Sequence, residues 1–541
     1  MPTLDWIGKQ AVVNHHREVP YRLIHCDGEL SAGDADAGNL LVQGDNLEAL
    51  RALLPYYAGK VKCIYIDPPY NTGNEGWIYN DNVNSPEIRA WLDKVVGKEG
   101  EDLSRHDKWL CMMYPRLRLI REFLREDGAV FISIDDHEIA NLRLVLSDIF
   151  GEQNFVANVV WQRIYTTKNS ARYFSDMHEH LVVVARDKAR WDRRNLPRAA
   201  KQDDAYTNPD DDHRGVWKAT PVHARNFYSK GRYPIKAPSG RVIDGPPSGT
   251  YWRYSEEKFK ELQRDGRIWW GEKGDNIPAQ KRFLTDVQEG LVPTTWWTYA
   301  DAGHNAEAKN EVRDIFFGHE DVFSTPKPVK LISRILQIAT DPGDLILDSF
   351  AGSGTTGQAV LNLNKQDGGD RRFILVEMDE VISKDVTAER LRRVIDGYDK
   401  GGDPEKPVEG LGSGFRFCRL GAPLFDEFGD VATEVTFPDL AAHIFFSETG
   451  VPIPHRAQSE FLGVFQDRAV YLLSNAAHAE TPREVAGNVL TPDRLDELPD
   501  PPEVFEGTRV IYAEGCTVSA DRLKRAGAVF KQIPYQIDGA R

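Results

Sequence analysis

Two consecutive prolines, Pro68 and Pro69, follow the apolar run at residues 61–66, with only Asp67 between the run and the prolines. The run predicts a buried strand of a parallel sheet, and the prolines end it because proline has no backbone N–H to donate to a neighbouring strand. A stiff loop therefore begins at the carboxyl end of the strand, which is where ligands bind in open α/β sheets. This feature predicts an α/β fold and the edge of the sheet that carries its site.

The loop brings three chemical groups close together in sequence: the Asp67 carboxylate, the Pro68 carbonyl and the Tyr70 ring. An exocyclic amine on a planar base needs two acceptors for its N–H groups and an aromatic face for stacking. The alternative is a plain strand-ending turn with an aspartate cap. Tyr70 and a second motif near residue 350 favour the site.

The second motif is a glycine-rich turn at residues 348–357, between a predicted strand at 345–347 and a predicted helix at 358–363. Strand, turn and helix in this order form the first half of a nucleotide-binding βαβ unit, whose glycines let the backbone approach the ligand. A further strand at 373–376 ends in Glu377, and an acidic residue there suits a pair of ribose hydroxyls.

The glycines of this turn, Gly352, Gly354 and Gly357, also match a dinucleotide fingerprint, so an NAD-dependent oxidoreductase is an alternative. Two features count against it. The hydroxyl-rich segment 353–356 is not typical of a pyrophosphate turn. The Asp67 loop has no role in hydride transfer.

Together, the motifs resemble those of DNA adenine-N6 methyltransferases, which use S-adenosyl-L-methionine. Residues 67–70 match the catalytic motif Asp-Pro-Pro-Tyr, and residues 350–354 match the cofactor motif Phe-x-Gly-x-Gly. The catalytic motif comes first and a long insert follows, as in the beta class of these enzymes. Residues 71–73 and the closing segment 530–535 resemble the modification (Mod) subunit of type III restriction-modification systems.

The resemblance implies the residues of the site. The catalytic set is Asp67, Pro68, Pro69 and Tyr70. The cofactor set is Asp45, Lys327, Asp348, Phe350, Gly352, Gly354, Thr355 and Glu377. Asp67 and the Pro68 carbonyl would accept the N–H groups of a flipped-out adenine, while Tyr70 stacks on its ring. On the cofactor, Glu377 would hold the ribose, Asp45 the adenine amine, and Lys327 would lie near the carboxylate.

The implied fold is a doubly wound, Rossmann-like methyltransferase sheet made from two separated segments, with a target-recognition domain inserted between them and a small C-terminal α/β domain. We therefore expect a catalytic half at residues 1–160, a DNA-binding insert at 161–323, a cofactor-binding half at 324–400 and a protein-contact domain at 401–541. Glycine and proline predict a linker at 399–414, and acidic residues with prolines predict an exposed loop at 493–506.

Three other functions of related motifs stay open. Relatives with serine in place of the motif's aspartate methylate cytosine N4, so a DNA cytosine-N4 methyltransferase is the first alternative. Asn-Pro-Pro-Tyr relatives modify protein glutamines, although Asp67 argues against this. A non-catalytic DNA-specificity subunit is the third. Similar chains serve in restriction, in other phage-defence systems and alone, so we expect duplex DNA, a second copy and a restriction/helicase subunit or other defence protein as partners.

The net charge of −16 is unusual for a DNA-binding protein, but the charge is unevenly distributed. Residues 213–243 contain no acidic residue and interleave aromatic with basic side chains. Basic side chains neutralise phosphates and aromatic rings stack on bases, so this segment predicts DNA contact; an ordinary solvated face is the alternative. The candidates are Arg214, Lys218, Arg225, Lys230, Arg232, Lys236 and Arg241.

The remaining composition bounds the class of protein. The sequence has no stretch of about 18 apolar residues and no N-terminal signal pattern, so we expect a cytoplasmic bacterial or archaeal protein without a membrane span. None of its five cysteines belongs to a Cys-x-x-Cys pair, and we expect reduced thiols. The histidines of the segment 178–180 lack a third ligand at a usable spacing, so we predict no metal site.

Overall fold

The computed structural model describes residues 4–72, 105–198, 204–286, 290–319, 322–426, 428, 430–473, 488–501 and 505–533. The chain divides into two compact units, one made of Met1–Arg194 with Thr294–Arg541 and the other of Asn195–Pro293. None of the described helices is long and apolar enough to span a membrane.

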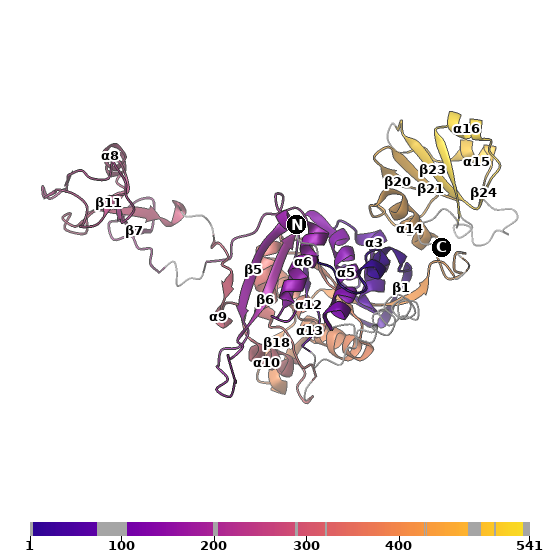
Figure 1. The fold of residues 1–541 in the computed structure, drawn as a ribbon, viewed down its shortest axis with the longest axis horizontal. Helices are drawn as coiled ribbons and strands as arrows, with labels where there is room; N and C mark the ends of the chain where they lie inside the picture. Colours follow the sequence, from indigo (N-terminus) through magenta and orange to yellow (C-terminus); the bar gives the residue numbers. More distant parts are fainter. Residues whose placement is uncertain are drawn as a thin grey trace. The chain divides into compact units, whose positions relative to one another are not determined.

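The larger unit contains a ten-stranded sheet (Figure 1). From one edge to the other, its strands are β1 (Arg22–Gly33), β19 (Gly414–Pro423), β2 (Leu40–Gln43), β16 (Arg372–Glu377), β15 (Leu345–Asp348), β3 (Val61–Ile66), β4 (Leu124–Ile134), β6 (His178–Ala185), β5 (Phe155–Gln162) and β14 (Trp296–Trp297). The strands from β19 to β4 run parallel, β1 is antiparallel to β19, and β6 is antiparallel to both of its neighbours.

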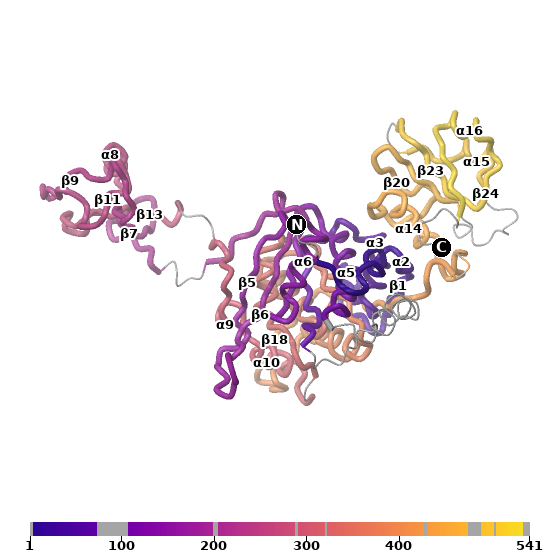
Figure 2. Tube along the Cα trace, viewed as in Figure 1, coloured from indigo at the N-terminus to yellow at the C-terminus, as the bar shows by residue number. Residues whose placement is uncertain are grey.

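The centre of this sheet joins two distant parts of the chain. β3 pairs with β15, so that Cys63 lies opposite Ile346 and Ile64 opposite Leu347. From β15 the chain passes through α12 (Thr355–Asp367) to β16 on one side, and from β3 through α5 (Arg105–Phe123) to β4 on the other. In Figure 2, indigo and orange segments, which are distant in sequence, lie within one body. The order of strands thus reverses between β3 and β15, and such a switch point opens a crevice at the carboxyl ends.

Helices cover both faces of the sheet. Ile64 and Ile66 of β3 pack in one apolar cluster with α5, α3 (Asn46–Tyr57) and α6 (Ile139–Phe150). Gly357 of α12 lies against Phe373 and Leu375, whose neighbours Ile374 and Val376 belong to the first cluster. Because successive side chains of a strand point to opposite faces, α12 lies on the other face. The sheet is therefore doubly wound, and the strand predicted at 61–66 is confirmed with every residue buried.

The remaining helices of this unit flank the same framework. They are α1 (Lys9–Val12), α2 (His15–Glu18), α9 (Tyr299–Ala302), α10 (Asn305–Ile315), α11 (Val329–Ala339), α13 (Glu389–Asp396) and α14 (Phe437–Thr449). α11 packs along α12, and α13 follows a π-helical segment, Ile382–Ala388.

The smaller unit lies within the insert predicted at 161–323 but is shorter. Residues 161–194 and 294–323 belong to the larger unit, because β6 pairs between β4 and β5, and β14 pairs with β5. The smaller unit has a three-stranded sheet of β12 (Ile268–Trp269), β13 (Ala279–Phe283) and β7 (Trp217–Pro221). Its other elements are β8 (His223–Ala224) paired with β11 (Tyr251–Trp252), β9 (Ile235–Lys236) paired with β10 (Val242–Ile243), and α8 (Glu256–Arg264).

Of two predictions after residue 396, one is wrong and one is wrong in part. The segment 399–414 is no linker, because β17 (Gly397–Asp399) pairs with β18 (Pro407–Glu409) and the chain then returns to the main sheet as β19. The loop predicted at 493–506 is wrong at its start, which belongs to α15 (Pro492–Glu497), a helix whose Thr491 side chain accepts from the Arg494 N–H. Residues 498–501 and 505–506 lie in no helix or strand, and 502–504 lie outside the described residues. A side-chain cap and a buried Leu495 outweigh the acidic, proline-rich composition.

The small C-terminal α/β domain expected after residue 400 contains strands near residues 470 and 510. A four-stranded sheet has the order β20 (Phe461–Phe465), β21 (Arg468–Leu472), β23 (Thr508–Ala513) and β25 (Ala528–Gln532), and its last three strands run parallel. β22 (Val489–Leu490) pairs with β24 (Gly515–Cys516), and α16 (Ala520–Arg525) precedes β25. This part of the chain therefore has an α/β fold of its own.

The expectation of five reduced cysteines is also wrong. Cys26 of β1 and Cys418 of β19 form a disulfide, and the two residues lie directly opposite each other in the antiparallel pairing. The two are 392 positions apart, so only the pairing of the strands brings them together. Cys63, Cys111 and Cys516 are free thiols.

The disulfide predicts a labelling pattern. Unfolded in denaturant without reductant, the protein should react with iodoacetamide at the three free cysteines and, after reduction, at all five. Peptide mass spectrometry measures this, with Cys26→Ser as a control that frees Cys418. Full labelling of Cys26 without reductant in the wild type would contradict the pairing.

Candidate active site

A cavity of about 670 Å³ lies at the carboxyl ends of β3, β15 and β16. The loop after β3, the glycine-rich turn after β15 and the residues after β16 form much of its wall, and β6 and the segment 323–327 close it. The structure therefore brings the two sequence motifs to one cavity, as their positions after neighbouring parallel strands require.

The Asp67 loop is held by buried groups behind it. The indole N–H of Trp109, which is fully buried, donates to the Pro69 carbonyl at 2.7 Å. Asn71 has a left-handed backbone with φ of 60° and donates to the buried carboxylate of Glu138. Asparagine tolerates this conformation better than most residues. The prolines and these two anchors fix where Asp67 and Tyr70 lie.

Glu138 collects three donors around one buried carboxylate. Besides Asn71, it accepts from Asn141 at 2.7 Å, and its oxygen lies 2.6 Å from the Nδ1 of His106. A buried carboxylate without partners is costly, so this network both satisfies Glu138 and ties the loop to α5 and α6. The sequence analysis missed Glu138, because no local pattern distinguishes it.

Asp67 carries opposing electrostatic influences. Burial raises the pKa of its carboxyl, while the Lys327 ammonium, at 2.8 and 2.7 Å from the two carboxylate oxygens, lowers it. The hydroxyl of Tyr70 also contacts Asp67, at 2.8 Å. Lys327, predicted near the cofactor carboxylate, thus contacts the carboxylate of Asp67.

Glu179 is a second carboxylate in the cavity, and the sequence analysis missed it. Its side chain is 4% exposed, receives a hydrogen bond from Arg163 at 3.0 Å and lies 3.5 Å from the Lys327 ammonium. One signal was available: a glutamate stands two positions before the apolar run 181–184, within β6. Such a residue in a buried strand needs polar partners, which here lie in the cavity.

Tyr70 connects the two carboxylates. Its hydroxyl oxygen is 2.8 Å from Asp67 and 2.9 Å from Glu179. A tyrosine has one hydroxyl proton, so the second contact is favourable only when one carboxyl group holds a proton. Burial and the nearby Glu179 charge raise the pKa of Asp67, while the Lys327 ammonium and the Tyr70 hydroxyl bond oppose this rise.

The glycine-rich turn leaves no room for side chains. Gly352 has φ of 49°, and a Cβ there would lie 2.9 Å from the Phe323 ring. Gly354 has φ of 78° and would meet Thr387 at 3.1 Å. The Gly352 N–H donates to the Glu377 carboxylate at 2.8 Å, so the turn and the acidic end of β16 form one wall. Phe350 is buried and lines the cavity beside them.

Asp348 and Thr355 line the cavity but also bind the protein itself. Asp348 accepts from the Phe350 N–H at 3.0 Å and from the Thr356 hydroxyl, and burial raises the pKa of Asp348 to about 7. The Thr355 hydroxyl donates to the Lys327 carbonyl and accepts from the buried guanidinium of Arg390. The buried guanidinium of Arg390 needs acceptors for its N–H groups, and hydroxyl oxygens such as that of Thr355 supply them. This need explains why the turn is rich in hydroxyl groups.

Asp45 is not among the residues that line the cavity. Its carboxylate caps α3 by accepting from the Leu47 and Glu48 N–H groups, and it pairs with Arg116 at 3.0 Å. It lies at the carboxyl end of β2, next to β16 in the sheet. Its role toward a cofactor stays a prediction.

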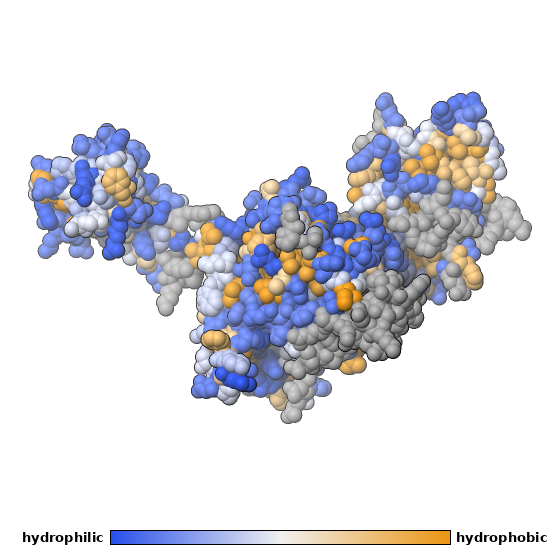
Figure 3. Space-filling view, viewed as in Figure 1, coloured by the Kyte–Doolittle hydropathy of each residue, from blue (hydrophilic) through white to orange (hydrophobic). Residues whose placement is uncertain are grey.

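The basic candidates all lie in the smaller unit. Arg214 is engaged by Asp212, which accepts two hydrogen bonds from it at 2.9 and 2.8 Å. The other six are exposed: Lys218, Arg225, Lys230, Arg232, Lys236 and Arg241. The guanidinium of Arg232 lies 4.9 Å from the Tyr251 ring centre, and Phe227 beside it is 78% exposed. The face of this unit visible in Figure 3 is mostly hydrophilic.

Comparison with known protein families identifies the family to which a chain with this cavity belongs. A family model described as DNA methylase matches residues 61–389, which include both motifs and the segment between them. The chain belongs to this DNA methylase family.

Relatives of this DNA methylase include subunits of restriction enzymes. The Mod subunit of the type III restriction-modification enzyme StyLTI from Salmonella typhimurium is 36% identical over 407 residues, 72% of this chain and 60% of that protein. The Mod subunit of EcoPI from Escherichia phage P1 is 31% identical over 433 residues, 71% of this chain and 64% of that protein. The chain thus spans only about three fifths of these relatives' length.

A solved structure was also matched. A DNA modification methylase of Thermus thermophilus, complexed with S-adenosyl-L-methionine, aligns with 67% of this chain and 98% of its own, at 13% identity and a TM-score of 0.31.

The anchoring of the loop predicts a loss of stability. Glu138→Ala leaves buried donors without an acceptor and should lower the free energy of unfolding by roughly 2–4 kcal/mol. Urea denaturation followed by tryptophan fluorescence measures this. The exposed Glu405→Ala is the matched control and should change it by less than about 0.5 kcal/mol. Equal stability of the two variants would show that Glu138 does not anchor the loop.

Proposed function

We propose that this DNA methylase transfers the methyl group of S-adenosyl-L-methionine to the N6 amine of a flipped-out adenine in duplex DNA. One observation carries the proposal: the Asp67 loop and the glycine-rich turn line the same cavity at the switch point of the sheet. An acceptor site for an amine and a cradle for a nucleoside cofactor are then neighbours.

The residues of the cavity fit the cofactor. Gly352 and Gly354 have positive φ, and a Cβ at either would crowd Phe323 or Thr387, so this turn requires glycine. Glycines in such a turn let the backbone approach a ligand. Glu377 already accepts two backbone N–H bonds, and a carboxylate has lone pairs left for a pair of ribose hydroxyls. The bound cofactor supplies an electrophilic methyl group on a sulfonium.

The catalytic loop would orient the target amine. The N6 lone pair of adenine is delocalised into the ring, so the amine is a poor nucleophile. If Asp67 and the Pro68 carbonyl accept its two N–H bonds, the nitrogen turns pyramidal and its lone pair points at the methyl group. The enzyme supplies positioning and electrostatics for an in-line transfer. The base must leave the duplex to reach Asp67, and Tyr70 would stack on it.

Lys327 would have to release Asp67 when the amine binds. Both carboxylate oxygens contact its ammonium, and the amine needs one of them. Glu179 offers the ammonium a second anion at 3.5 Å, so Lys327 can shift without losing a charged partner. This keeps the buried charges compensated as the substrate enters.

The proposed function also implies binding partners. We propose that the exposed basic side chains of the smaller unit bind DNA phosphates, that the chain pairs with a second copy, and that it serves a type III restriction-modification or related defence system in the bacterial or archaeal cytoplasm. The identity to Mod subunits and the basic, aromatic-rich segment 213–243 support this proposal.

The proposal predicts the modification of cellular DNA. Long-read sequencing of DNA from cells expressing the chain should show N6-methyladenine at one short motif, and Asp67→Ala should abolish it while cofactor affinity stays within about threefold, since Asp67 contacts the amine rather than the cofactor. Modified cytosine would instead support the cytosine-N4 alternative. Full methylation by Asp67→Ala would refute the mechanism.

The Lys327 contact predicts a shift in the pH profile. Methyl transfer needs ionised Asp67, so activity is lost as the pH falls through the pKa of Asp67. Lys327 lowers this pKa, while burial and the Glu179 charge raise it. Lys327→Gln should therefore move the acid limb of single-turnover methylation, at saturating cofactor, to higher pH. Lys330→Gln, whose side chain is 55% exposed, should leave it in place. An unmoved limb in Lys327→Gln would disprove the coupling.

A further inference from the structure

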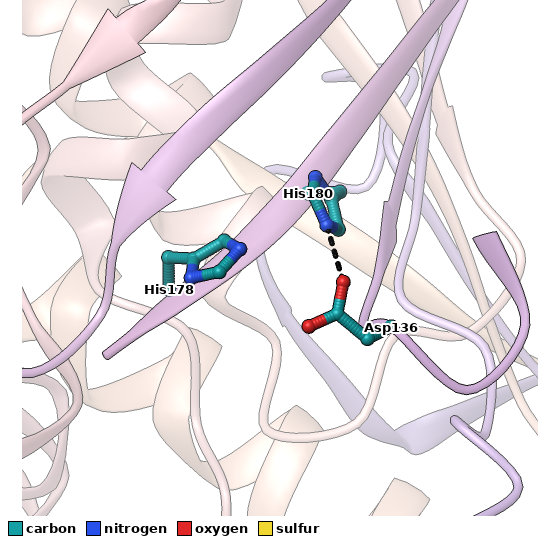
Figure 4. A group of neighbouring side chains, drawn as sticks. All are labelled: Asp136, His178 and His180. Carbon is teal, nitrogen blue, oxygen red and sulfur yellow. Dashed lines mark hydrogen bonds and ion pairs between the residues drawn. The ribbon is translucent and has the colours of Figure 1, made fainter. Parts of the chain in front are cut away.

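Three potential ligands converge outside the cavity, on the strand that carries Glu179. His178 and His180 of β6 and Asp136, just after β4, place their ligand atoms within 4.8 Å of one another (Figure 4). Asp136 lies 2.9 Å from the Nε2 of His180, and the two imidazole rings are 5.0 Å apart and nearly perpendicular. We infer that these three residues form a binding site for a zinc-type divalent metal ion.

The pairing of strands creates the site. Residues two apart on a strand share a face, so His178 and His180 point together while Glu179 points to the cavity. β4 is antiparallel to β6 with Ile134 opposite His180, which places Asp136 at the end of β4 beside the histidines. The sequence predicted no metal site because a third ligand was missing. The tertiary structure supplies it from 42 residues earlier in the chain.

A neighbouring side chain is ready to orient one ligand. The amide of Asn158 lies 3.3 Å from the Nδ1 of His180, and the Asn158 oxygen is buried without a hydrogen-bond partner. Turning the amide over would let this oxygen accept from an Nδ1–H and leave Nε2 free to bind a metal. Metal-binding histidines usually donate their other N–H to such an acceptor.

The donor set favours zinc among the common ions. Two imidazoles and one carboxylate suit Zn²⁺, whereas Mg²⁺ and Ca²⁺ prefer oxygen ligands alone. Asp136 is 71% exposed, so water can fill a fourth position. Tetrahedral ligands at about 2.1 Å from zinc lie roughly 3.4 Å apart, and rotations of the partly exposed His178 and Asp136 can reach this spacing.

The site would join two walls of the cavity. Asp135 and His137, on either side of Asp136, line the cavity, as does Glu179 between the histidines. A metal ion would tie the end of β4 to the start of β6 and so restrain these groups. The inference does not depend on methyl transfer, and it can be tested without DNA or cofactor.

Metal binding by the full chain, purified without a polyhistidine tag and stripped with EDTA, tests the inference. Plasma mass spectrometry should find one equivalent of bound Zn²⁺ per chain. Competition with a chromogenic chelator measures the affinity of this binding. His178→Gln and Asp136→Asn should each weaken binding at least about tenfold, since loss of even an outer-shell partner costs this much. Co²⁺ should give the visible absorption of a tetrahedral site in the wild type and not in these variants.

Two controls separate this site from other histidines. His137→Gln removes a neighbouring imidazole that contacts Asp135, and His213→Gln removes one that is 88% exposed in the smaller unit. Both should bind Zn²⁺ like the wild type. Wild-type binding no tighter than that of His178→Gln, or an equal loss in His137→Gln, would overturn the inference. Thermal unfolding of the metal-free variants should match that of the metal-free wild type, because Asp136 is exposed and His178 is half-buried.

Discussion

The pairing of β3 with β15 places two segments that are about 280 residues apart in sequence beside each other at the centre of the sheet. Each strand is followed by its own loop, and parallel strands end at the same edge, so the Asp67 loop and the glycine-rich turn meet there. The doubly wound helices cover both faces and leave this edge as the place for a ligand. The cavity, its glycine-rich wall and the position of Asp67 all depend on that one pairing.

The second constraint is charge. Asp67, Glu179, Lys327 and Arg163 bring two anions and two cations into a partly buried space. A buried charge without a partner is costly, so each carboxylate has a cation and each cation has a carboxylate. The Tyr70 hydroxyl contacts both carboxylates and so links them. Such an arrangement can exchange partners without leaving a charge uncompensated, which the proposed entry of a neutral amine requires.

Prediction from the sequence succeeded where a local pattern has one physical meaning. The apolar run before Pro68 predicted a strand that the prolines end. The glycines of 352–354 predicted a turn directly after a strand. It failed where composition competes with tertiary contacts. The segment 399–414 looked like a linker, yet its residues 407–409 pair with β17 and Gly414 pairs with Gly33 of β1. The bounds of the inserted unit were too wide, because β6 and β14 complete the main sheet.

The sequence alone determined the fold class, both motifs and the edge of the sheet on which they act, because strand-ending prolines and positive-φ glycines impose local geometry. Only the tertiary structure decided which charged groups meet. Lys327 and Glu179 reach Asp67 from other strands and loops, Cys26 meets Cys418 across an antiparallel pair, and Asp136 joins His178 and His180. These contacts depend on strand order and register, which arise from packing across the whole sheet and leave no mark in any single stretch of sequence.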